Sequence, residues 1–306
     1  MHLWVINPLD MLRITLLLML LSGSAFAQDD LLTILDNENQ SDTKEPLTAT
    51  FKTTRIVTGQ SVELNHGGVV NFVIQHRFGT INSGLYELFG LDQASIKLNL
   101  ELGVTNRLNA GIARSSIGKF YEGYLKYKLV KQRKEGFPLS IVAYSSMGID
   151  SRRWSDPTRD NLFSSRLYYT HQLLMASRIS PGTSIQVMPT LVHRNLVETT
   201  ADKNDVVILG VGGRQKINKR VAVNAEYYYI LPNQVVSNSS SLHHSFSLGF
   251  DIETGGHVFQ LHVTNSRQMS DKGFLTETDG SWSKGDIIFG FNISRVFNVY
   301  NWKKDW

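Results

Sequence analysis

The chain of 306 residues contains no cysteine. A disulfide framework, a lipidated N-terminal cysteine, thiolate metal ligands and a cysteine nucleophile are therefore all excluded. Charge is also sparse, since Asp, Glu, Lys and Arg make up 19% of the residues and the formal net charge is +4. An excess this small and this dispersed does not predict nucleic-acid binding. Composition alone does not separate a soluble β protein from a membrane barrel, because the lumen and loops of such a barrel are polar.

Long apolar runs are scarce as well. The longest, Leu16–Leu21, has under half of the ~20 residues that a membrane-spanning helix needs. It follows Arg13 and precedes a segment that ends in Ala25-Phe26-Ala27. A basic residue, a short apolar run and a small-x-small ending predict a signal peptide over residues 1–27, cleaved before Gln28, rather than an anchor. The acid-containing residues 1–10 stand ahead of this pattern and indicate Met11 as the natural start.

Apolar and polar residues alternate with a period of two from Val69 onward. In residues 94–105 one face carries Ala94, Ile96, Leu98, Leu100, Leu102 and Val104, and the other carries Ser95, Lys97, Asn99, Glu101, Gly103 and Thr105. Successive strand side chains point to opposite faces, so this pattern predicts strands with one apolar and one polar face. The length of this segment is close to the ~9–11 residues of a tilted strand that crosses a bilayer.

The pattern predicts twelve strands. They lie near residues 69–78, 94–105, 107–115, 121–130, 139–149, 162–177, 184–194, 205–215, 220–231, 242–253, 257–265 and 286–297. Short turns follow the even strands, and longer loops follow the odd ones except at residues 116–120, as in outer-membrane barrels. We therefore predict an all-β fold: a single antiparallel transmembrane β-barrel over residues 69–306. A polar periplasmic lead over residues 28–68 precedes it, and both barrel ends lie on the periplasmic side.

A soluble β-sandwich or lipocalin-like barrel shows the same alternation, with its apolar face inward. Three features favour the membrane: an apolar face rich in Leu, Ile, Val, Phe and Tyr, a polar face that is not dense in Lys and Glu, and aromatics near strand ends, as in interfacial girdles. The terminal Trp306 adds weak support. We expect the cell outer membrane as the location after Sec-type export, with outer-membrane lipid and the barrel insertion machinery as partners.

Several motifs resemble a known family. They are His76-Arg77-Phe78-Gly79, the segment Gly84-Leu85-Tyr86-Glu87-Leu88-Phe89-Gly90-Leu91-Asp92-Gln93-Ala94, Arg114-Ser115-Ser116 and Lys126-Tyr127-Lys128. From about Thr48 to the C-terminus the chain is similar to a family of uncharacterised outer-membrane β-barrel proteins of Bacteroidetes, a domain of unknown function. The resemblance implies an outer-membrane barrel and supplies no activity and no functional residues.

The polar face supplies the candidate site residues, which we expect to line the lumen. The basic ones are Arg77, Lys97, Lys126, Lys128, Arg166, Arg194 and Arg214, and the acidic ones are Glu101, Glu226, Asp251 and Glu253. In a narrow open pore this basic excess would favour anions. The alternative is a closed network of salt bridges that fills a small barrel.

Other candidate functional features have weaker support in the sequence. The loop Ser83–Asp92 has apolar residues at near-helical spacing and either folds inward as a constriction, lies over the mouth of the barrel or packs on the rim as a short amphipathic turn. His243-His244 lacks the carboxylate or cysteine partners of a metal site. A lipid-acting hydrolase needs a Ser/His pair on the wall, and His171 and His193 lack a nucleophile motif. Gly210-x-Gly212-Gly213 indicates close backbone packing within a strand.

We therefore expect a non-enzymatic, porin-like barrel that passes or binds small polar or anionic solutes. No catalytic residue, metal site or cofactor is predicted, and nucleic acid is not an expected partner. The competing hypothesis is a structural or loop-interaction barrel with a blocked lumen. A lipid-acting hydrolase is the third and weakest alternative.

Overall fold

The structure, a computed structural model, describes residues 50–299 except 134, 155, 237–240 and 255–256. The predicted signal peptide, residues 28–49 of the predicted lead and Trp306 lie outside the described residues. Within the described residues, no helix is long and apolar enough to cross a membrane.

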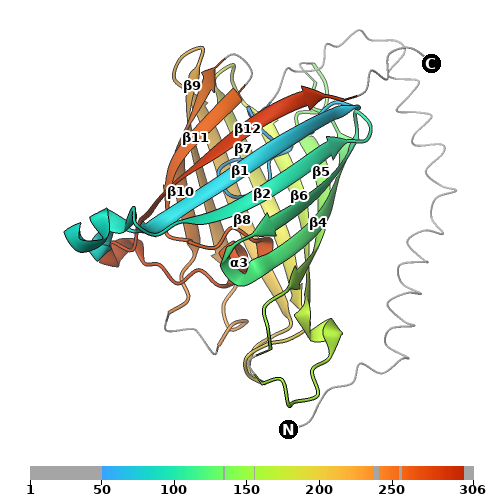
Figure 1. Ribbon diagram of the computed structural model, residues 1–306. Coiled ribbons are helices and arrows are strands. Elements are labelled where there is room, and N and C mark those ends of the chain that lie inside the picture. Colours follow the sequence, from blue (N-terminus) through green and yellow to red (C-terminus); the bar gives the residue numbers. More distant parts are fainter. Residues whose placement is uncertain (1–49, 134, 155, 237–240, 255–256, 300–306) are drawn as a thin grey trace, which may run out of the picture. The chain divides into compact units, whose positions relative to one another are not determined.

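The described chain forms a closed barrel of antiparallel strands (Figure 1). The strands are β1 (Val69–Thr80), β2 (Ser95–Gly103), β3 (Leu108–Ser115), β4 (Phe120–Val130), β5 (Ser140–Asp150), β6 (Leu167–Arg178), β7 (Thr183–Arg194), β8 (Asp205–Lys216), β9 (Val221–Ile230), β10 (Ser245–Thr254), β11 (His257–Thr264) and β12 (Ile288–Asn298). Each strand pairs with its neighbours in sequence, and β1 pairs with β12 to close the ring. The predicted all-β barrel is confirmed.

The alternation of residue types decides which side chains face inward. In β2, Leu98 is 40% exposed on the outside, whereas Asn99 is 1% exposed on the inside. Asn99 lies opposite Val73 of β1 and Ala113 of β3, and both of these are also buried. Inward residues of neighbouring strands therefore form one row, as the pleat requires. The apolar face is the exposed outer surface of the barrel.

The two rims carry connections of different length. The turns after β2, β4, β6 and β8 lie at the end where β1 begins and β12 ends, which we call the short-turn rim. The connections after the odd strands lie at the opposite end, the long-loop rim, and Figure 1 shows them gathered there. Among these connections, only the one between β3 and β4, residues 116–119, is short.

The loop between β1 and β2 stays at the long-loop rim. It forms the short 3-10 helices η2 (Ile81–Ser83) and η3 (Leu85–Gly90). Leu85 is 76% exposed and Tyr86 is 96% exposed. The hypothesis that this loop folds inward as a constriction is therefore wrong, and a turn on the rim is what the chain forms.

Residues 50–65, which we call the plug hairpin, occupy the lumen from the short-turn rim. Arg55 and Gln60 form an antiparallel bridge, and the Ile56 N–H donates to the Gly59 carbonyl at 2.9 Å to close the turn. We had expected this stretch to precede the barrel as part of a polar lead. A barrel of twelve strands encloses more space than its own wall side chains fill, so an inserted segment can pack there.

Residues 265–287, which we call the inward loop, enter the lumen from the long-loop rim. They contain the helix α3 (Asp271–Thr276), whose N-cap Ser270 accepts a hydrogen bond from the Gly273 N–H. Phe274 and Leu275 are buried in an apolar cluster with wall residues of β4 to β9 and with Phe51, Ile56, Val57 and Val62 of the plug hairpin. Burial of two large apolar side chains holds α3 in the lumen.

Candidate functional site

The wall strands β1 to β4 and β10 to β12 present polar and charged groups to the plug hairpin. Glu101 is 1% exposed and accepts hydrogen bonds from the Thr54 hydroxyl at 2.7 Å and the Tyr124 hydroxyl at 2.7 Å. It also pairs with Arg55 at 3.4 Å and accepts a hydrogen bond from the Asn71 side-chain amide at 3.3 Å. A buried carboxylate is stable only with such partners. The hairpin thus supplies the cation and one of the hydroxyl groups that this wall residue needs.

Glu226 of β9 binds the turn of the hairpin directly. Its carboxylate accepts the backbone N–H groups of Thr58 at 2.7 Å, Gly59 at 3.1 Å and Val57 at 3.3 Å. Three consecutive amides that converge on one carboxylate form a cradle for an anion. The backbone of the hairpin turn is therefore positioned by one wall carboxylate, and Arg77 of β1 adds a hydrogen bond to the Thr58 hydroxyl at 2.9 Å.

The rest of the hairpin is held by wall side chains that bond to its backbone carbonyls. These bonds run from Lys126 to Thr54 (3.2 Å) and Glu63 (2.8 Å), from Gln260 to Ile56 (3.0 Å), from Asn292 to Val57 (2.7 Å), from Gln186 to Gln60 (2.7 Å) and from Ser184 to Thr50 (2.7 Å). Among the described residues, the backbone-to-backbone hydrogen bonds of residues 50–65 run within the hairpin itself. The hairpin is bound to the wall without being a strand of the sheet.

Two glycines allow the hairpin to approach the wall. A Cβ on Gly59 would lie 1.6 Å from the Tyr228 hydroxyl, and a Cβ on Gly212 would lie 2.5 Å from Cδ1 of Ile56. The Gly210-x-Gly212-Gly213 motif therefore serves close packing, as the sequence indicated. Tyr228 also packs edge-on against Phe274, with ring centroids 5.2 Å apart. The two inserted segments thus meet at this one wall tyrosine.

A second charged cluster joins the wall to the inward loop. Lys97 forms an ion pair with Glu122 and donates to the Met269 carbonyl at 2.9 Å. Glu122 accepts the Asp271 N–H at 2.7 Å and the Tyr168 hydroxyl at 2.9 Å. The Asp271 carboxylate in turn accepts hydroxyl hydrogen bonds from Tyr144 and Ser146. The base of the inward loop is fixed by this network.

The structure places the eleven predicted lumen residues in three settings. Seven are buried on the inner face: Arg77, Lys97, Glu101, Lys126, Arg194, Glu226 and Asp251. Three are partly exposed near the short-turn rim: Lys128, Arg214 and Glu253. Arg166 lies at the long-loop rim. Arg214 pairs with Asp251 at 3.6 Å, and Glu253 pairs with Lys52 of the hairpin at 2.6 Å.

Sequence reasoning missed three charged groups of the lumen. Glu122 has the same strand parity as the predicted Lys126, so alternation was a sufficient signal for it. Arg55 and Asp271 lie in segments that carry no alternation, and no sequence signal placed them inside. With Glu122 and Asp271 included, the inward basic excess that predicted an anion preference is smaller. Three ion pairs, Arg55–Glu101, Lys97–Glu122 and Arg214–Asp251, neutralise part of the buried charge.

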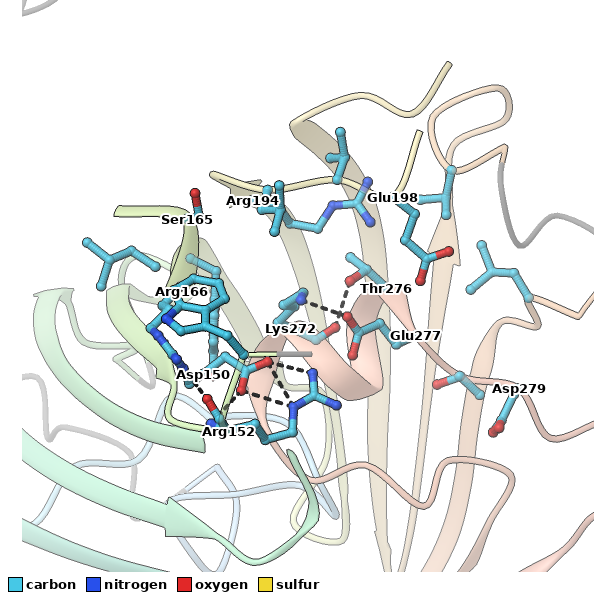
Figure 2. Close-up of a pocket in the computed structure, with 18 of the residues that line it drawn as sticks. Asp150, Arg152, Ser165, Arg166, Arg194, Glu198, Lys272, Thr276, Glu277 and Asp279 are labelled. Carbon is cyan, nitrogen blue, oxygen red and sulfur yellow. Dashed lines mark hydrogen bonds and ion pairs between the residues drawn. The ribbon is translucent and has the colours of Figure 1, made fainter. Parts of the chain in front are cut away.

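Above α3 the long-loop rim contains an open cavity of about 710 Å³, which we call the vestibule. Figure 2 shows side chains from three loops and from α3 around it. The charged residues that line it are Asp150, Arg152, Arg153, Arg166, Arg194, Glu198, Lys272, Glu277 and Asp279. Trp154, Leu196, Val235 and Leu242 add apolar surface. Its size falls within the ~300–1,000 Å³ of ordinary small-ligand sites.

One wall of the vestibule is rigid and basic. The Arg166 guanidinium stacks on Trp154 at 3.9 Å and donates to the backbone carbonyls of Asp150 and Arg152. Arg152 forms a forked ion pair with the Asp150 carboxylate at 2.5 Å. These hydrogen bonds to a carboxylate raise the pKa of Arg152 above its ordinary value. Both guanidinium groups are therefore held in place and charged.

The outer face carries two polar pairs that involve the histidines considered above. Ser145 Oγ lies 3.0 Å from Nδ1 of His171, and Asp205 lies 2.7 Å from Nδ1 of His193. Among the described residues, His171 has a hydrogen bond to Ser145 alone, so the pair lacks the orienting carboxylate of a catalytic triad. Within that same part of the chain no cluster of His, Asp or Glu is arranged to hold a metal. That the protein is not an enzyme stays a prediction.

A family model described as "Membrane bound beta barrel domain (DUF5777)" matches residues 51–297. The matched range runs from the plug hairpin through β12. No curated protein matches the chain in sequence. Together with the closed barrel, the family match confirms the predicted resemblance to a membrane-barrel family of unknown function and the predicted location in the outer membrane.

Three solved structures illustrate the likeness of the fold. The NanC porin is 9% identical with a TM-score of 0.46, over 74% of this chain and 98% of that chain. The KdgM porin is 11% identical with a TM-score of 0.46, over 75% of this chain and 99% of that chain. An outer-membrane channel from Pseudomonas putida F1 is 12% identical with a TM-score of 0.45, over 77% of this chain and 97% of that chain.

Proposed function

Because this chain belongs to the family of membrane-bound beta barrel domains, we propose that it is a gated barrel that passes small polar solutes across the outer membrane. The plug hairpin is the gate, and the described conformation is the closed state. One observation carries the proposal: the hairpin fills the lumen through side-chain hydrogen bonds and adds no strand to the sheet.

The sheet does not depend on the hairpin. Each strand already has two strand neighbours, and the ring is closed by the pairing of β1 with β12. Departure of residues 50–65 therefore breaks no hydrogen bond of the barrel ladder. A plug that shares no ladder bond with the wall can leave while the wall stays intact.

The wall behind the hairpin suits water. The groups that hold the hairpin are carboxylates, amides, hydroxyls and basic groups, namely Glu101, Glu226, Gln186, Gln260, Asn292, Ser184, Lys126 and Arg77. Water replaces hydrogen-bond partners for such groups at little net cost. The helix α3 rests on apolar wall residues, so the inward loop is expected to stay and to narrow the open passage. Phe51, Ile56, Val57 and Val62 of the hairpin pack in the same apolar cluster, so departure of the hairpin exposes apolar surface and the closed state is favoured.

The solute class follows from the same groups. The lumen carries both signs of charge, with Lys97 beside Glu122 and Arg214 beside Asp251. Such a wall accepts polar solutes and gives a weaker anion preference than an unpaired basic excess would. The competing function is a permanently blocked barrel that acts through its loops, and the large apolar contact of α3 favours that alternative.

A reversible lock tests the gate. A Cβ on Gly249 would lie 3.4 Å from Cγ2 of Val57, so a Val57→Cys/Gly249→Cys pair brings two thiols within bonding reach. The natural chain has no cysteine, so the bond is unambiguous. In planar bilayers we expect the oxidised barrel to be silent and the same sample to conduct after reduction. Gating is refuted if the reduced barrel stays silent under every voltage and if Gly59→Ala, described below, is silent as well.

A further inference from the structure

The two sides of the vestibule differ in net charge, although each also holds one charge of the opposite sign. Asp150 is paired with Arg152 on the basic side, and Lys272 is paired with Glu277 at 2.8 Å on the acidic side. Arg152, Arg153 and Arg166 belong to the connection between β5 and β6, whereas Glu277 and Asp279 belong to the inward loop and Glu198 to the connection between β7 and β8. Figure 2 shows Arg152 and Arg166 on one side of the cavity and Glu198, Glu277 and Asp279 on the other. A ligand in the cavity therefore lies between a basic wall and an acidic wall.

We propose that the vestibule binds zwitterionic solutes of the short-peptide class. The peptide carboxylate faces the basic wall, and the peptide ammonium faces the acidic wall. A simple anion or a simple cation would meet like charges on one side, which opposes binding, whereas a zwitterion is complementary to both walls. This inference deepens the proposed function. It rests on that function because a bound solute crosses the membrane only if the gate opens.

Arg194 supplies a second, independent observation. Its side chain comes from the end of β7, is 7% exposed and lines the cavity. One terminal nitrogen donates to the Lys203 carbonyl at 2.7 Å. The buried Nε finds no acceptor within the described residues. The guanidinium of Arg194 therefore adds a positive charge to the lining, and its terminal nitrogens carry further donor hydrogens.

The position of Arg194 favours a peptide over a single amino acid. In Figure 2 its guanidinium lies between the basic and acidic sides of the cavity. A peptide carries carbonyl oxygens between its two charged ends, and one of these can accept a hydrogen bond from the terminal nitrogens of this guanidinium. The apolar surface of Trp154, Leu196, Val235 and Leu242 is available to the peptide side chains. The volume of about 710 Å³ accommodates a ligand of a few residues.

The test uses trialanine and its two blocked forms, measured by titration calorimetry on the folded, detergent-solubilised full barrel. Trialanine is expected to bind more tightly than N-acetyl-trialanine or trialanine amide, by about tenfold for each lost charge, which equals about 1.4 kcal/mol. Binding is also expected to weaken as salt rises, because the rim charges are partly exposed. Equal binding of all three peptides, or no binding of trialanine, overturns the proposal.

Two substitutions assign the walls. Arg153→Gln should weaken trialanine and N-acetyl-trialanine and leave trialanine amide unchanged. Glu277→Gln should weaken trialanine and trialanine amide and leave N-acetyl-trialanine unchanged. Arg159→Gln removes the same charge from an exposed residue of the same loop that does not line the cavity, so it serves as the matched control. If neither wall variant shows its selectivity while the control behaves as wild type, the zwitterion site is refuted.

The measurement separates this inference from the gate. Titrations are run on the oxidised Val57→Cys/Gly249→Cys barrel, in which the hairpin stays in place. If the barrel binds trialanine but conducts neither after reduction nor with the Gly59→Ala substitution, the gate is refuted and the vestibule site is left standing. A barrel that conducts after reduction but does not bind trialanine when locked refutes the vestibule site and leaves the gate standing.

Discussion

Gly59→Ala should open the barrel without touching its wall. The added methyl would lie 1.6 Å from the Tyr228 hydroxyl and 2.8 Å from the adjacent ring carbon. Tyr228 is 0% exposed, so its ring has no free space into which to move. The backbone of Gly59 lies outside the left-handed region, so the substitution adds bulk and no backbone strain. Overpacking of this kind costs about 1–3 kcal/mol.

This cost acts on the gate equilibrium because the clash exists only while the hairpin is in place. A destabilisation of about 1–3 kcal/mol raises the ratio of open to closed barrels by about 5- to 150-fold. Planar-bilayer recordings of the refolded variant should show this rise in open probability at unchanged single-channel conductance. Heat-dependent gel mobility provides a check that the barrel itself is folded.

Two further variants make the result interpretable. Gly67→Ala lies just outside the hairpin, and its Cβ would lie 3.4 Å from the nearest atom, so it should behave as wild type. Tyr228→Phe removes the closest clashing atom and should partly restore closure in the Gly59→Ala background. An open probability that is equal in wild type and Gly59→Ala would show that the hairpin is not a gate or that it does not pack tightly against Tyr228.

Two other substitutions test the facing and the pairing of the wall. Leu98→Arg places a charge on the outer face near mid-strand, which costs about 2–4 kcal/mol in a bilayer, so folded barrel should be lost from purified outer membranes. Asn99→Arg should still assemble but face Arg55, whose guanidinium lies 3.0 Å from the side-chain amide oxygen of Asn99, and so raise conductance. Equal yields of both variants would contradict the assigned faces. Lys97→Met leaves Glu122 buried without its cation and should lower the free energy of unfolding by about 3–5 kcal/mol, whereas Lys97→Met/Glu122→Gln should lose clearly less. Denaturant titration that ranks the double variant below the single one would refute the pairing.

The barrel wall was predictable because its physical rule is local. Every second residue of a strand lies on the apolar outer surface. The alternation of Ile96, Leu98 and Leu100 with polar residues therefore predicts β2 without information about any other strand. Turn lengths supplied the second local signal, because neighbouring antiparallel strands need only short links. The predicted and observed strands agree along the whole ring for this reason.

The contents of the lumen were not predictable by the same rule. Residues 50–65 satisfy their backbone through wall side chains such as Glu226 and Asn292, so they need no periodic pattern. Phe274 and Leu275 form only a short apolar pair in a long loop, and nothing local distinguishes that pair from a rim contact. The loop Ser83–Asp92 has the stronger apolar pattern and yet stays at the rim. Shape and space inside the closed ring decide which segment enters.

The candidate site was predictable in part for the same reasons. Lys97, Glu101 and Glu226 lie on the inner face because strand parity places them there. Their functional setting was hidden, since the hairpin and the inward loop bring Arg55 and Asp271 from outside the strand pattern. The vestibule depends on four separate connections meeting at one rim, and only the closed fold brings them together.

The long sequence separation between the hairpin and its seat constrains how the protein assembles. Thr58 and Glu226 are 168 positions apart, and Val57 and Asn292 are 235 positions apart. Contacts between residues so far apart in the sequence form late, because the chain between the two residues must first be ordered. The complete set of wall side chains that hold the hairpin comes together only after β12 has paired with β1. During insertion the barrel therefore passes through a stage with a hydrated interior, and closing the lumen is a late event of its biogenesis.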